Sequence, residues 1–286
     1  MSGIRCALVL LLLAFGWTSG CSRPDRSDAG DEIGAAPAVT GEARDDTHRR
    51  APLVFASVET DPLWREVLAA PDRSEADRAL DGGRRPGEIF TFFGIARGQR
   101  VADLFAGTGY TTELLARAVG AEGLVVAQNN TFVLDRFARA PLAARLAAPA
   151  LAHVVAVERP LDDPIPDGVR DLDAVVFVLA YHDAIWQGAD RARMNRRVHE
   201  ALRPGGVYGI VDHLAANGSG ERDARSLHRI DRRLLIEEIE AAGFRLDAEL
   251  ELLRNPDDRR DWNAAPSAAG PLRGTSDRVV LRFVKP

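Results

Sequence analysis

The hydrophobic positions of the chain predict strands that alternate with helices from residue 100 to residue 242. Short apolar runs predict five buried strands, at residues 100–105, 123–127, 154–157, 172–179 and 207–211. Apolar side chains spaced three and four residues apart predict four helices, at residues 110–119, 131–147, 189–202 and 231–242. Strands that alternate with helices are typical of an α/β domain with a mostly parallel sheet and helices on both faces.

The C-terminal part of the pattern differs, because two predicted strands follow each other with only a polar loop between them. These strands occupy residues 244–253 and 278–284. Strands joined without a crossover helix are antiparallel. We therefore expect a seven-stranded, mostly parallel sheet that ends in an antiparallel hairpin at one edge.

The chain before residue 100 divides into three segments. Residues 1–20 contain Arg5 and then a short apolar run, which predicts an export signal that is too short to span a membrane. Residues 21–60 are mostly polar, which predicts a flexible tether. Residues 61–93 predict two or three short helices, the first beginning at Asp61-Pro62. We expect one folded domain that spans residues 61–286.

The chain contains two cysteines, Cys6 and Cys21, so no disulfide framework or zinc–thiolate site can form in the folded region. The sequence Thr18-Ser19-Gly20-Cys21 resembles a bacterial lipobox, in which the cysteine is lipidated after cleavage. We expect an exported protein on the periplasmic side, attached to a membrane only through a lipid on Cys21. Ordinary secretory cleavage near the same place is the alternative.

The most informative motif is a glycine turn between the first strand and the first helix of the alternating region. It reads Asp103-Leu104-Phe105-Ala106-Gly107-Thr108-Gly109. Glycines let a ligand approach the backbone closely, and the following helix N-terminus offers unpaired N–H groups. Thr112 stands where a dinucleotide-binding motif has its third glycine, and no P-loop lysine follows. The turn predicts a ligand site at the carboxyl edge of the sheet, with a purely structural turn as the alternative.

This acid-led glycine turn resembles motif I of the class I S-adenosylmethionine-dependent methyltransferases, although Phe105 replaces the usual first glycine. Further segments match a narrower group, among them Phe92-Phe93-Gly94-Ile95, Leu202-Arg203-Pro204-Gly205-Gly206 and Arg254-Asn255-Pro256-Asp257-Asp258. Through them, residues 61–286 also resemble an exported group of predicted methyltransferases that are distantly similar to the ubiquinone/menaquinone C-methyltransferases. The resemblance implies a Rossmann-like class I methyltransferase fold and S-adenosylmethionine as cofactor, with Asp103 near the methionine amino group. It assigns the following positions to the cofactor: Asp103, Ala106, Gly107, Thr108, Gly109, Tyr110, Gln128, Asn129 and Glu158.

The end of the second strand departs from the family pattern. Class I methyltransferases usually have an acid there that binds the ribose hydroxyls, whereas this chain has Gln128 and Asn129. An amide can bond a hydroxyl, but without the charge-assisted strength of a carboxylate. We expect these amides to contact the ribose, and Glu158, after the third strand, to contact the adenine.

Histidines and acids follow the fourth and fifth predicted strands, as Tyr181-His182-Asp183 and Asp212-His213. We expect them to converge on one pocket beside the cofactor, with His228 nearby. Histidine can take up a proton near neutral pH, so the candidate catalytic residues are His182, Tyr181, Asp183 and His213. Hydrogen bonds between loops, or a metal site, are the alternatives. We expect no metal, because adjacent His and Asp side chains do not readily both point inward and no fixed-spacing motif is present.

Charge and composition narrow the substrate class. The chain is 46% hydrophobic, which excludes a disordered protein, and its net charge is −5. An acidic chain is poorly suited to nucleic-acid phosphates, and the Asn/Asp-Pro-Pro-aromatic motif of nucleic-acid methyltransferases is absent at Leu179-Ala180-Tyr181. We therefore expect a methyltransferase for a small or lipid-like molecule. An exported binding or scaffold protein that kept the fold without catalysis is the alternative, and a metal-dependent hydrolase is a third hypothesis.

Overall fold

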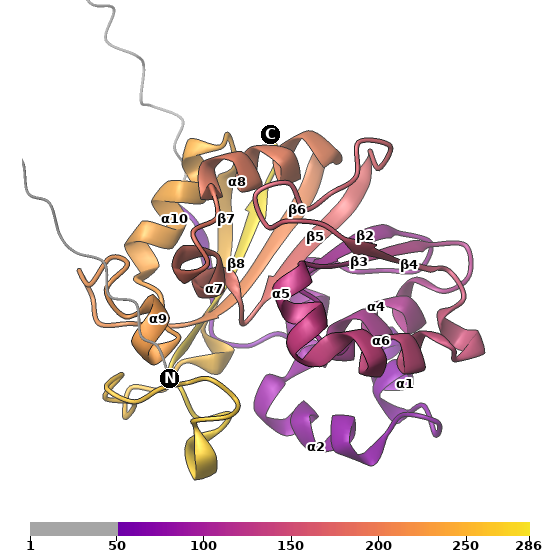
Figure 1. The fold of residues 1–286 in the computed structure, drawn as a ribbon, viewed down its shortest axis with the longest axis horizontal. Coiled ribbons are helices and arrows are strands. Elements are labelled where there is room, and N and C mark those ends of the chain that lie inside the picture. Colours follow the sequence, from indigo (N-terminus) through magenta and orange to yellow (C-terminus); the bar gives the residue numbers. More distant parts are fainter. Residues whose placement is uncertain (1–50) are drawn as a thin grey trace, which may run out of the picture. The chain divides into compact units, whose positions relative to one another are not determined.

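The computed structural model describes residues 51–286, which form an eight-stranded sheet with helices on both faces (Figure 1). The strand order is β1-β7-β8-β6-β5-β2-β3-β4. Strand β8 is antiparallel to both of its neighbours, β6 and β7, and the other neighbouring pairs are parallel. The predicted α/β class and the antiparallel C-terminal strands are thereby confirmed.

The strands are β1 (Leu53–Phe55), β2 (Arg100–Leu104), β3 (Leu124–Asn129), β4 (Val154–Glu158), β5 (Leu172–Val178), β6 (Leu202–His213), β7 (Arg245–Leu250) and β8 (Arg278–Val284). The α-helices are α1 (Pro62–Ala69), α2 (Glu75–Arg84), α3 (Pro86–Phe93), α4 (Tyr110–Val119), α5 (Thr131–Val133), α6 (Arg139–Leu146), α7 (Tyr181–Trp186), α8 (Arg191–Ala201), α9 (Ala224–Leu227) and α10 (Arg232–Ala241).

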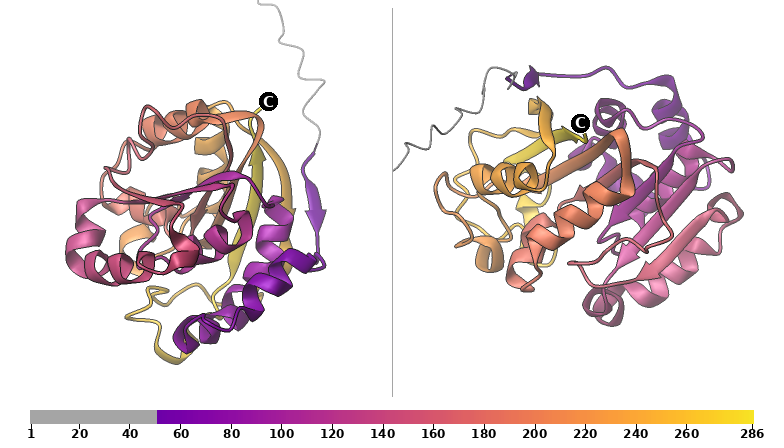
Figure 2. Two further views of the ribbon diagram at one scale, coloured as in Figure 1. Left: turned by 90° about the vertical axis from the view of Figure 1, so that its right-hand side faces the viewer. Right: turned by 90° about the horizontal axis from the view of Figure 1, so that it is seen from above.

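Two hydrophobic layers hold the helices against the sheet. On one face, α1, α3 and α4 bury Trp64, Phe93 and Leu114. On the other face, α8 and α10 bury Met194 and Ile239. Figure 2 shows the sheet between the indigo N-terminal helices and the orange helices of the later chain. The sheet is covered on both faces, which explains why most of its strands have almost continuous apolar sequences.

Strand β1 corrects two expectations. Leu53–Phe55 pairs with Ala248–Leu250 of β7, so the sheet has eight strands rather than seven, and the folded domain begins before residue 61. The side chains of Leu53 and Val54 are exposed. The segment is also short, and its apolar residues do not alternate with polar ones. It therefore lacks the pattern by which a half-buried strand is recognised in a sequence.

The helix expected at residues 131–147 is interrupted. It consists of α5, a π-helical turn at Leu134–Ala138, and α6. A π turn brings residues five positions apart onto the same side of a helix. Phe132 and Phe137 accordingly line the same cavity.

The parallel strands bring all candidate functional residues of the described chain to one edge of the sheet. The segments that follow the carboxyl ends of β2, β3, β5 and β6 lie at this edge. Residues 1–50, which hold the expected export signal, most of the tether and Cys21, lie outside the described residues. Within residues 51–286, every helix is too short or too polar to cross a bilayer.

Candidate functional site

The glycine turn joins β2 to α4 and has a backbone that few side chains tolerate. Phe105, Gly107 and Gly109 have φ values of 56°, 57° and 88°. Glycine adopts this left-handed region freely, whereas a phenylalanine there is strained. Leu142 and Arg145 of α6 lie only 2.8 and 2.9 Å from the point where a Cβ on Gly109 would stand. Gly109 is therefore required both by its φ and by the packing of α6.

Asp103 lies at the end of β2, directly beneath this turn. Its side chain is buried, and the Thr112 hydroxyl donates a 2.6 Å hydrogen bond to Oδ2. Burial raises the pKa of Asp103 to about 7, and the Thr112 hydrogen bond and the charge of Arg84 oppose this shift only in part. Burial therefore favours the neutral form of this carboxyl, and a cation beside it would favour the charged form.

The two amides that end β3 hold the backbone of the turn. Gln128 Oε1 accepts a hydrogen bond from the Phe105 N–H (3.0 Å), and its Nε2 donates to the carbonyl of Arg159 (2.7 Å). Asn129 Oδ1 accepts from the Gly107 N–H (2.8 Å), and its Nδ2 donates to the Gly107 carbonyl (3.0 Å). Both side chains are therefore used inside the protein, whereas we expected them to face the ribose. A carboxylate could not donate to the Gly107 carbonyl, which explains the amide at position 129.

The remaining cofactor candidates lie around the turn. Ala106 is half-buried and Thr108 is exposed. The Tyr110 hydroxyl donates to Asp81 at 2.7 Å, and the guanidinium of Arg84 lies 4.4 Å from the centre of the Tyr110 ring.

Glu158 stands apart from this group, at the end of β4. It is exposed and accepts a 3.0 Å hydrogen bond from Arg139. Together with Asn130 and Phe132 it lines a cavity of about 360 Å³ beside the carboxyl ends of β3 and β4.

A second cavity, of about 330 Å³, lies over the carboxyl ends of β2, β5 and β6. Its walls include Phe105 of the glycine turn and Leu179 after β5, and it is also lined by residues 264–267. Phe105, Leu179 and His228 have φ values of 56°, 59° and 52°. Non-glycine residues in this region cost about 1–3 kcal/mol each and cluster at functional sites. Three such residues around one cavity indicate that its shape is held at the expense of stability.

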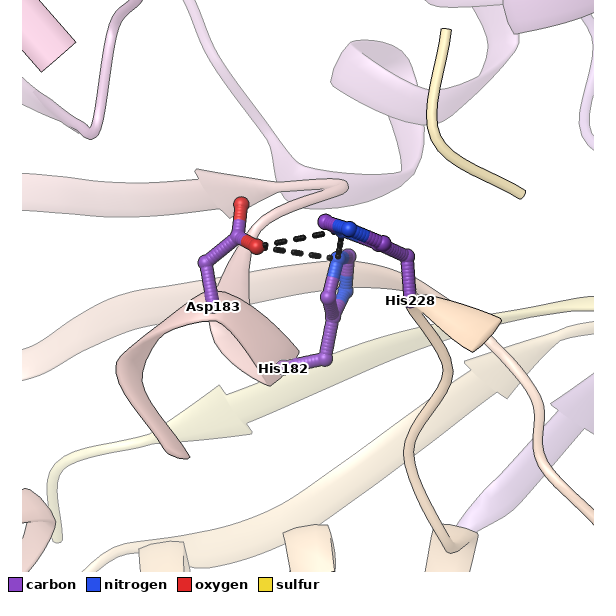
Figure 3. A group of neighbouring side chains, drawn as sticks. All are labelled: His182, Asp183 and His228. Atoms are coloured by element: carbon purple, nitrogen blue, oxygen red, sulfur yellow. Dashed lines mark hydrogen bonds and ion pairs between the residues drawn. The ribbon is translucent and has the colours of Figure 1, made fainter. Parts of the chain in front are cut away.

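Three side chains meet at their polar atoms in this cavity (Figure 3). His182 Nε2 lies 3.2 Å from His228 Nδ1 and 3.4 Å from Asp183 Oδ1, and His228 Nδ1 lies 3.3 Å from the same oxygen. We call His182, Asp183 and His228 the His–Asp–His trio. Our expectation that adjacent His and Asp side chains would not both point inward is wrong here. The two residues lie in the first turn of α7, where both side chains reach toward His228.

Buried partners hold the trio from behind. His182 Nδ1 lies 2.7 Å from Asp212 Oδ1, and Trp186 Nε1 donates a 2.6 Å hydrogen bond to Asp183 Oδ1. Asp212 Oδ2 also accepts a 2.9 Å hydrogen bond from the His182 backbone N–H. The orientation of the His182 ring is therefore determined at two points.

The expected convergence of the residues after β5 and β6 is confirmed for His182, Asp183 and His213, which all line the cavity, and His228 joins them. Tyr181 does not join them, although we expected it to. Its hydroxyl donates to Glu238 at 2.9 Å in the core beneath α8 and α10, because the first turn of α7 directs it away from His182.

We compared the chain with known proteins. No protein-family model matches it, and no curated protein matches its sequence. Among solved structures it is similar to an S-adenosylmethionine-dependent methyltransferase from Aquifex aeolicus, with a TM-score of 0.52 and 15% identity over 73% of this chain and 95% of that one. It is also similar to a protein from Galdieria sulphuraria assigned as a sarcosine dimethylglycine methyltransferase, with a TM-score of 0.53 and 14% identity over 82% of this chain and 94% of that one.

The chain has the class I methyltransferase fold. Identities this low establish the architecture and leave the reaction to be argued from the site. In this methyltransferase fold, the glycine turn, the 360 Å³ cavity and the 330 Å³ cavity all lie along the carboxyl edge of the sheet, where open α/β sheets bind ligands.

The charges within the 330 Å³ cavity are coupled. Burial by itself lowers the pKa of His182, but the charge and hydrogen bond of Asp212 outweigh it, so the pKa lies above its usual value. Burial raises the pKa of Asp183, yet the hydrogen bond from His228 and the charge of His182 bring it below its usual value. Burial and the charge of His182 hold the pKa of His213 well below its usual value. His182 therefore holds a proton more readily than His213 does.

An adjoining cavity of about 200 Å³ carries positive charge. Arg84, Arg273 and Arg278 line it together with His213. Arg278 donates to the carbonyls of Gly83 and Gly274, and burial lowers its pKa to about 10. Among residues 51–286, no carboxylate lies within ion-pair distance of Arg84 or Arg278. This cavity is suited to an anionic group.

Sequence reasoning did not single out Trp186 or Arg84. Trp186 lies three residues after Asp183, so a helix predicted at residues 181–186 would have placed the two on one face. Arg84 carries no local signal, because only the packing of α2 near the start of α4 brings it to the turn.

Proposed function

We propose that the protein is an S-adenosylmethionine-dependent methyltransferase that acts on a small or lipid-like molecule. One observation carries the proposal. The acid-led glycine turn of the methyltransferase fold shares a residue, Phe105, with the cavity that holds the His–Asp–His trio. A cofactor on this turn would therefore lie beside the polar groups of that cavity.

The proposed cofactor position uses three features of the carboxyl edge. The methionine ammonium faces Asp103, whose carboxyl lies buried beneath the turn. The methionine carboxylate faces Arg84, which has no carboxylate partner among the described residues. The adenine lies toward Glu158 and Asn130 in the 360 Å³ cavity.

The proposed acceptor lies in the 330 Å³ cavity. Phe105, Phe132, Leu179 and Trp186 give this cavity an apolar wall, which favours an acceptor with an aromatic or lipid-like part. The trio supplies the polar end, where it removes the proton of the attacking atom. The acceptor atom then forms a bond to the methyl carbon as the carbon–sulfur bond breaks, and that electron pair stays on sulfur to give S-adenosylhomocysteine.

The proposal is tested by following methyl transfer from labelled S-adenosylmethionine to extracted small molecules and lipids. We expect S-adenosylhomocysteine to form, and we expect His182→Ala to slow its formation by roughly 100-fold or more, as for loss of a general base. The matched control is Tyr181→Phe, whose hydroxyl bonds Glu238 in the core, and it should retain most of the rate. A folded wild-type protein that forms no S-adenosylhomocysteine with any fraction would contradict the proposal.

A further inference from the structure

We propose that the His–Asp–His trio binds one divalent transition-metal ion, with zinc as the best-suited ion. The ligand atoms are His182 Nε2, Asp183 Oδ1 and His228 Nδ1, which converge from α7 and from the turn after α9 (Figure 3). The site lies inside the 330 Å³ cavity and is formed entirely by described residues of this chain.

The spacing of the three atoms is that of ligands around one ion. They form a nearly equilateral triangle with sides of 3.2, 3.3 and 3.4 Å. Ligands at the usual zinc distances, in tetrahedral geometry, stand about 3.3–3.4 Å apart. An ion above the plane of this triangle would therefore reach all three atoms without rearrangement of the side chains.

Hydrogen counting at the trio also favours an ion. When the His182 Nδ1–H donates to Asp212, the Nε2 atom of a neutral ring has a lone pair and no hydrogen. The Asp183 carboxylate brings only acceptor atoms. When the His228 ring carries its hydrogen on Nε2, three electron-rich atoms point at one spot with no hydrogen between them. A cation would satisfy all three at once.

The second layer of contacts is the kind that metal sites use. Metal-binding histidines usually donate their other ring N–H to a carboxylate, which fixes the ring and makes it a better ligand. The buried Asp212 carboxylate is placed to accept this hydrogen bond from His182, since its Oδ1 lies 2.7 Å from His182 Nδ1. Trp186 restrains the Asp183 carboxylate at 2.6 Å. Two of the three ligands are therefore oriented before an ion arrives.

The types of ligand atom restrict which ion can bind, and access from the cavity restricts what the ion can do. Two imidazoles and one carboxylate favour zinc or another first-row transition metal over magnesium and calcium, which prefer oxygen ligands. Three protein ligands would leave a coordination position for a substrate, and all three side chains line the cavity.

A catalytic role for the ion rests on the proposed methyltransferase function. In that role the ion would bind an acceptor whose attacking atom is an oxygen, such as the hydroxyl of a phenol or an alcohol. With an ion bound, the ligand atoms of the trio are occupied, and the ion replaces them as the group that ionises the acceptor. The acceptor oxygen would bind the ion and lose its proton to water, because a metal lowers the pKa of a bound hydroxyl. The oxygen would then attack the methyl carbon, and the sulfur would keep the electron pair of the broken bond.

Metal binding is tested without cofactor or acceptor. The full-length chain, made without a histidine tag and stripped with a chelator, is titrated with Zn²⁺ and then with Co²⁺, whose absorption spectrum reports its coordination. We expect one equivalent of either ion to bind, with submicromolar affinity for zinc, and we expect zinc to raise the thermal unfolding temperature. His228→Ala should weaken zinc binding by more than 100-fold, and Asp212→Asn by about 10–100-fold, the usual effect of a second-layer change.

The matched control is His213→Ala. His213 lines the same cavity but is outside the trio, and its side chain is bonded to Ser276. This variant should bind zinc as the wild type does. The proposal is overturned if the folded wild type binds no stoichiometric zinc, or if His228→Ala binds zinc as tightly as the wild type. His228 is partly exposed, so its loss is compatible with folding. Titration with S-adenosylmethionine is a separate readout, so the metal site and the methyltransferase function can each fail alone.

Discussion

At the scale of single residues, the proposed cofactor site depends on Asp103. It is the buried acid beneath the glycine turn, and its neighbours are the Thr112 hydroxyl and the charge of Arg84. A carboxyl in this setting is close to its own midpoint near neutral pH, since burial raises its pKa to about 7. Its charge therefore depends on pH in a range where the cofactor ammonium stays positive.

We predict that S-adenosylmethionine binds more tightly as the pH rises from 5.5 to 7. The carboxylate form attracts the cofactor ammonium, and with a pKa of about 7 its population grows about 16-fold over this range. Calorimetric titration at several pH values measures the effect. Asp103→Asn, which keeps the shape of the side chain but cannot ionise, should bind weakly with no such dependence. An equal pH dependence in both proteins would contradict the assignment.

Ionisation of Asp103, which should strengthen cofactor binding, should lower the stability of the fold. Its folded-state pKa is above the unfolded value, so its contribution to stability is complete below the unfolded pKa and is lost as the pH rises through the folded pKa. Without ligand, the wild type should thus lose stability relative to Asp103→Asn between pH 4 and pH 8.

At the scale of elements, the end of β3 supports the turn after β2. Asn129 bonds both the N–H and the carbonyl of Gly107, an arrangement that a carboxylate cannot make. Amide contacts of this kind set the path of the backbone along which the proposed cofactor lies.

We predict that Asn129→Asp, which restores the acid usual in class I methyltransferases, destabilises the protein. A carboxylate would face the Gly107 carbonyl without a hydrogen to donate, and a buried unsatisfied group costs roughly 1–3 kcal/mol. Denaturant unfolding measures the loss, and cofactor affinity should fall as the turn loosens. Unchanged stability together with tighter cofactor binding would show that position 129 faces the ribose instead.

The sequence patterns predict elements that are regular and buried. The strands at residues 100–104 and 278–284 agree with the patterns almost to the residue, because each is apolar and covered. Three features escape prediction for a physical reason in each case. Strand β1 is exposed, α7 is too short to show a helical period, and the π turn changes the period within a helix.

For the candidate site, the sequence predicts which residues come together but not how their side chains are directed. Strand order explains why His182, Asp183 and His213 come together, since residues after parallel strands share one edge. Strand order does not determine the direction in which each side chain points. The first turn of α7 sends Tyr181 into the core, which reverses our expectation for that residue, and brings Asp183 to His228.

At the scale of the whole molecule, the fold provides one candidate functional edge, and we expect the chain before residue 51 to determine where in the cell that edge acts. We propose that Cys21 carries a lipid that attaches the domain to a membrane on the periplasmic side. We predict that the chain takes up labelled palmitate when made in bacteria, and that Cys21→Ser abolishes the label. Cys6→Ser is the matched control and should keep it. A label that survives Cys21→Ser would contradict lipidation at this residue.

The central claim is that the glycine turn binds S-adenosylmethionine. It is tested most directly by calorimetric titration of the full-length chain with S-adenosylmethionine and S-adenosylhomocysteine, beside Asp103→Asn and with folding checked by circular dichroism. We predict one site of micromolar affinity for both ligands, with binding at least about tenfold weaker in the variant, as for loss of a charged hydrogen-bond partner. A folded wild-type protein that binds neither ligand at millimolar concentration would contradict the account and leave an exported binding protein with a methyltransferase fold.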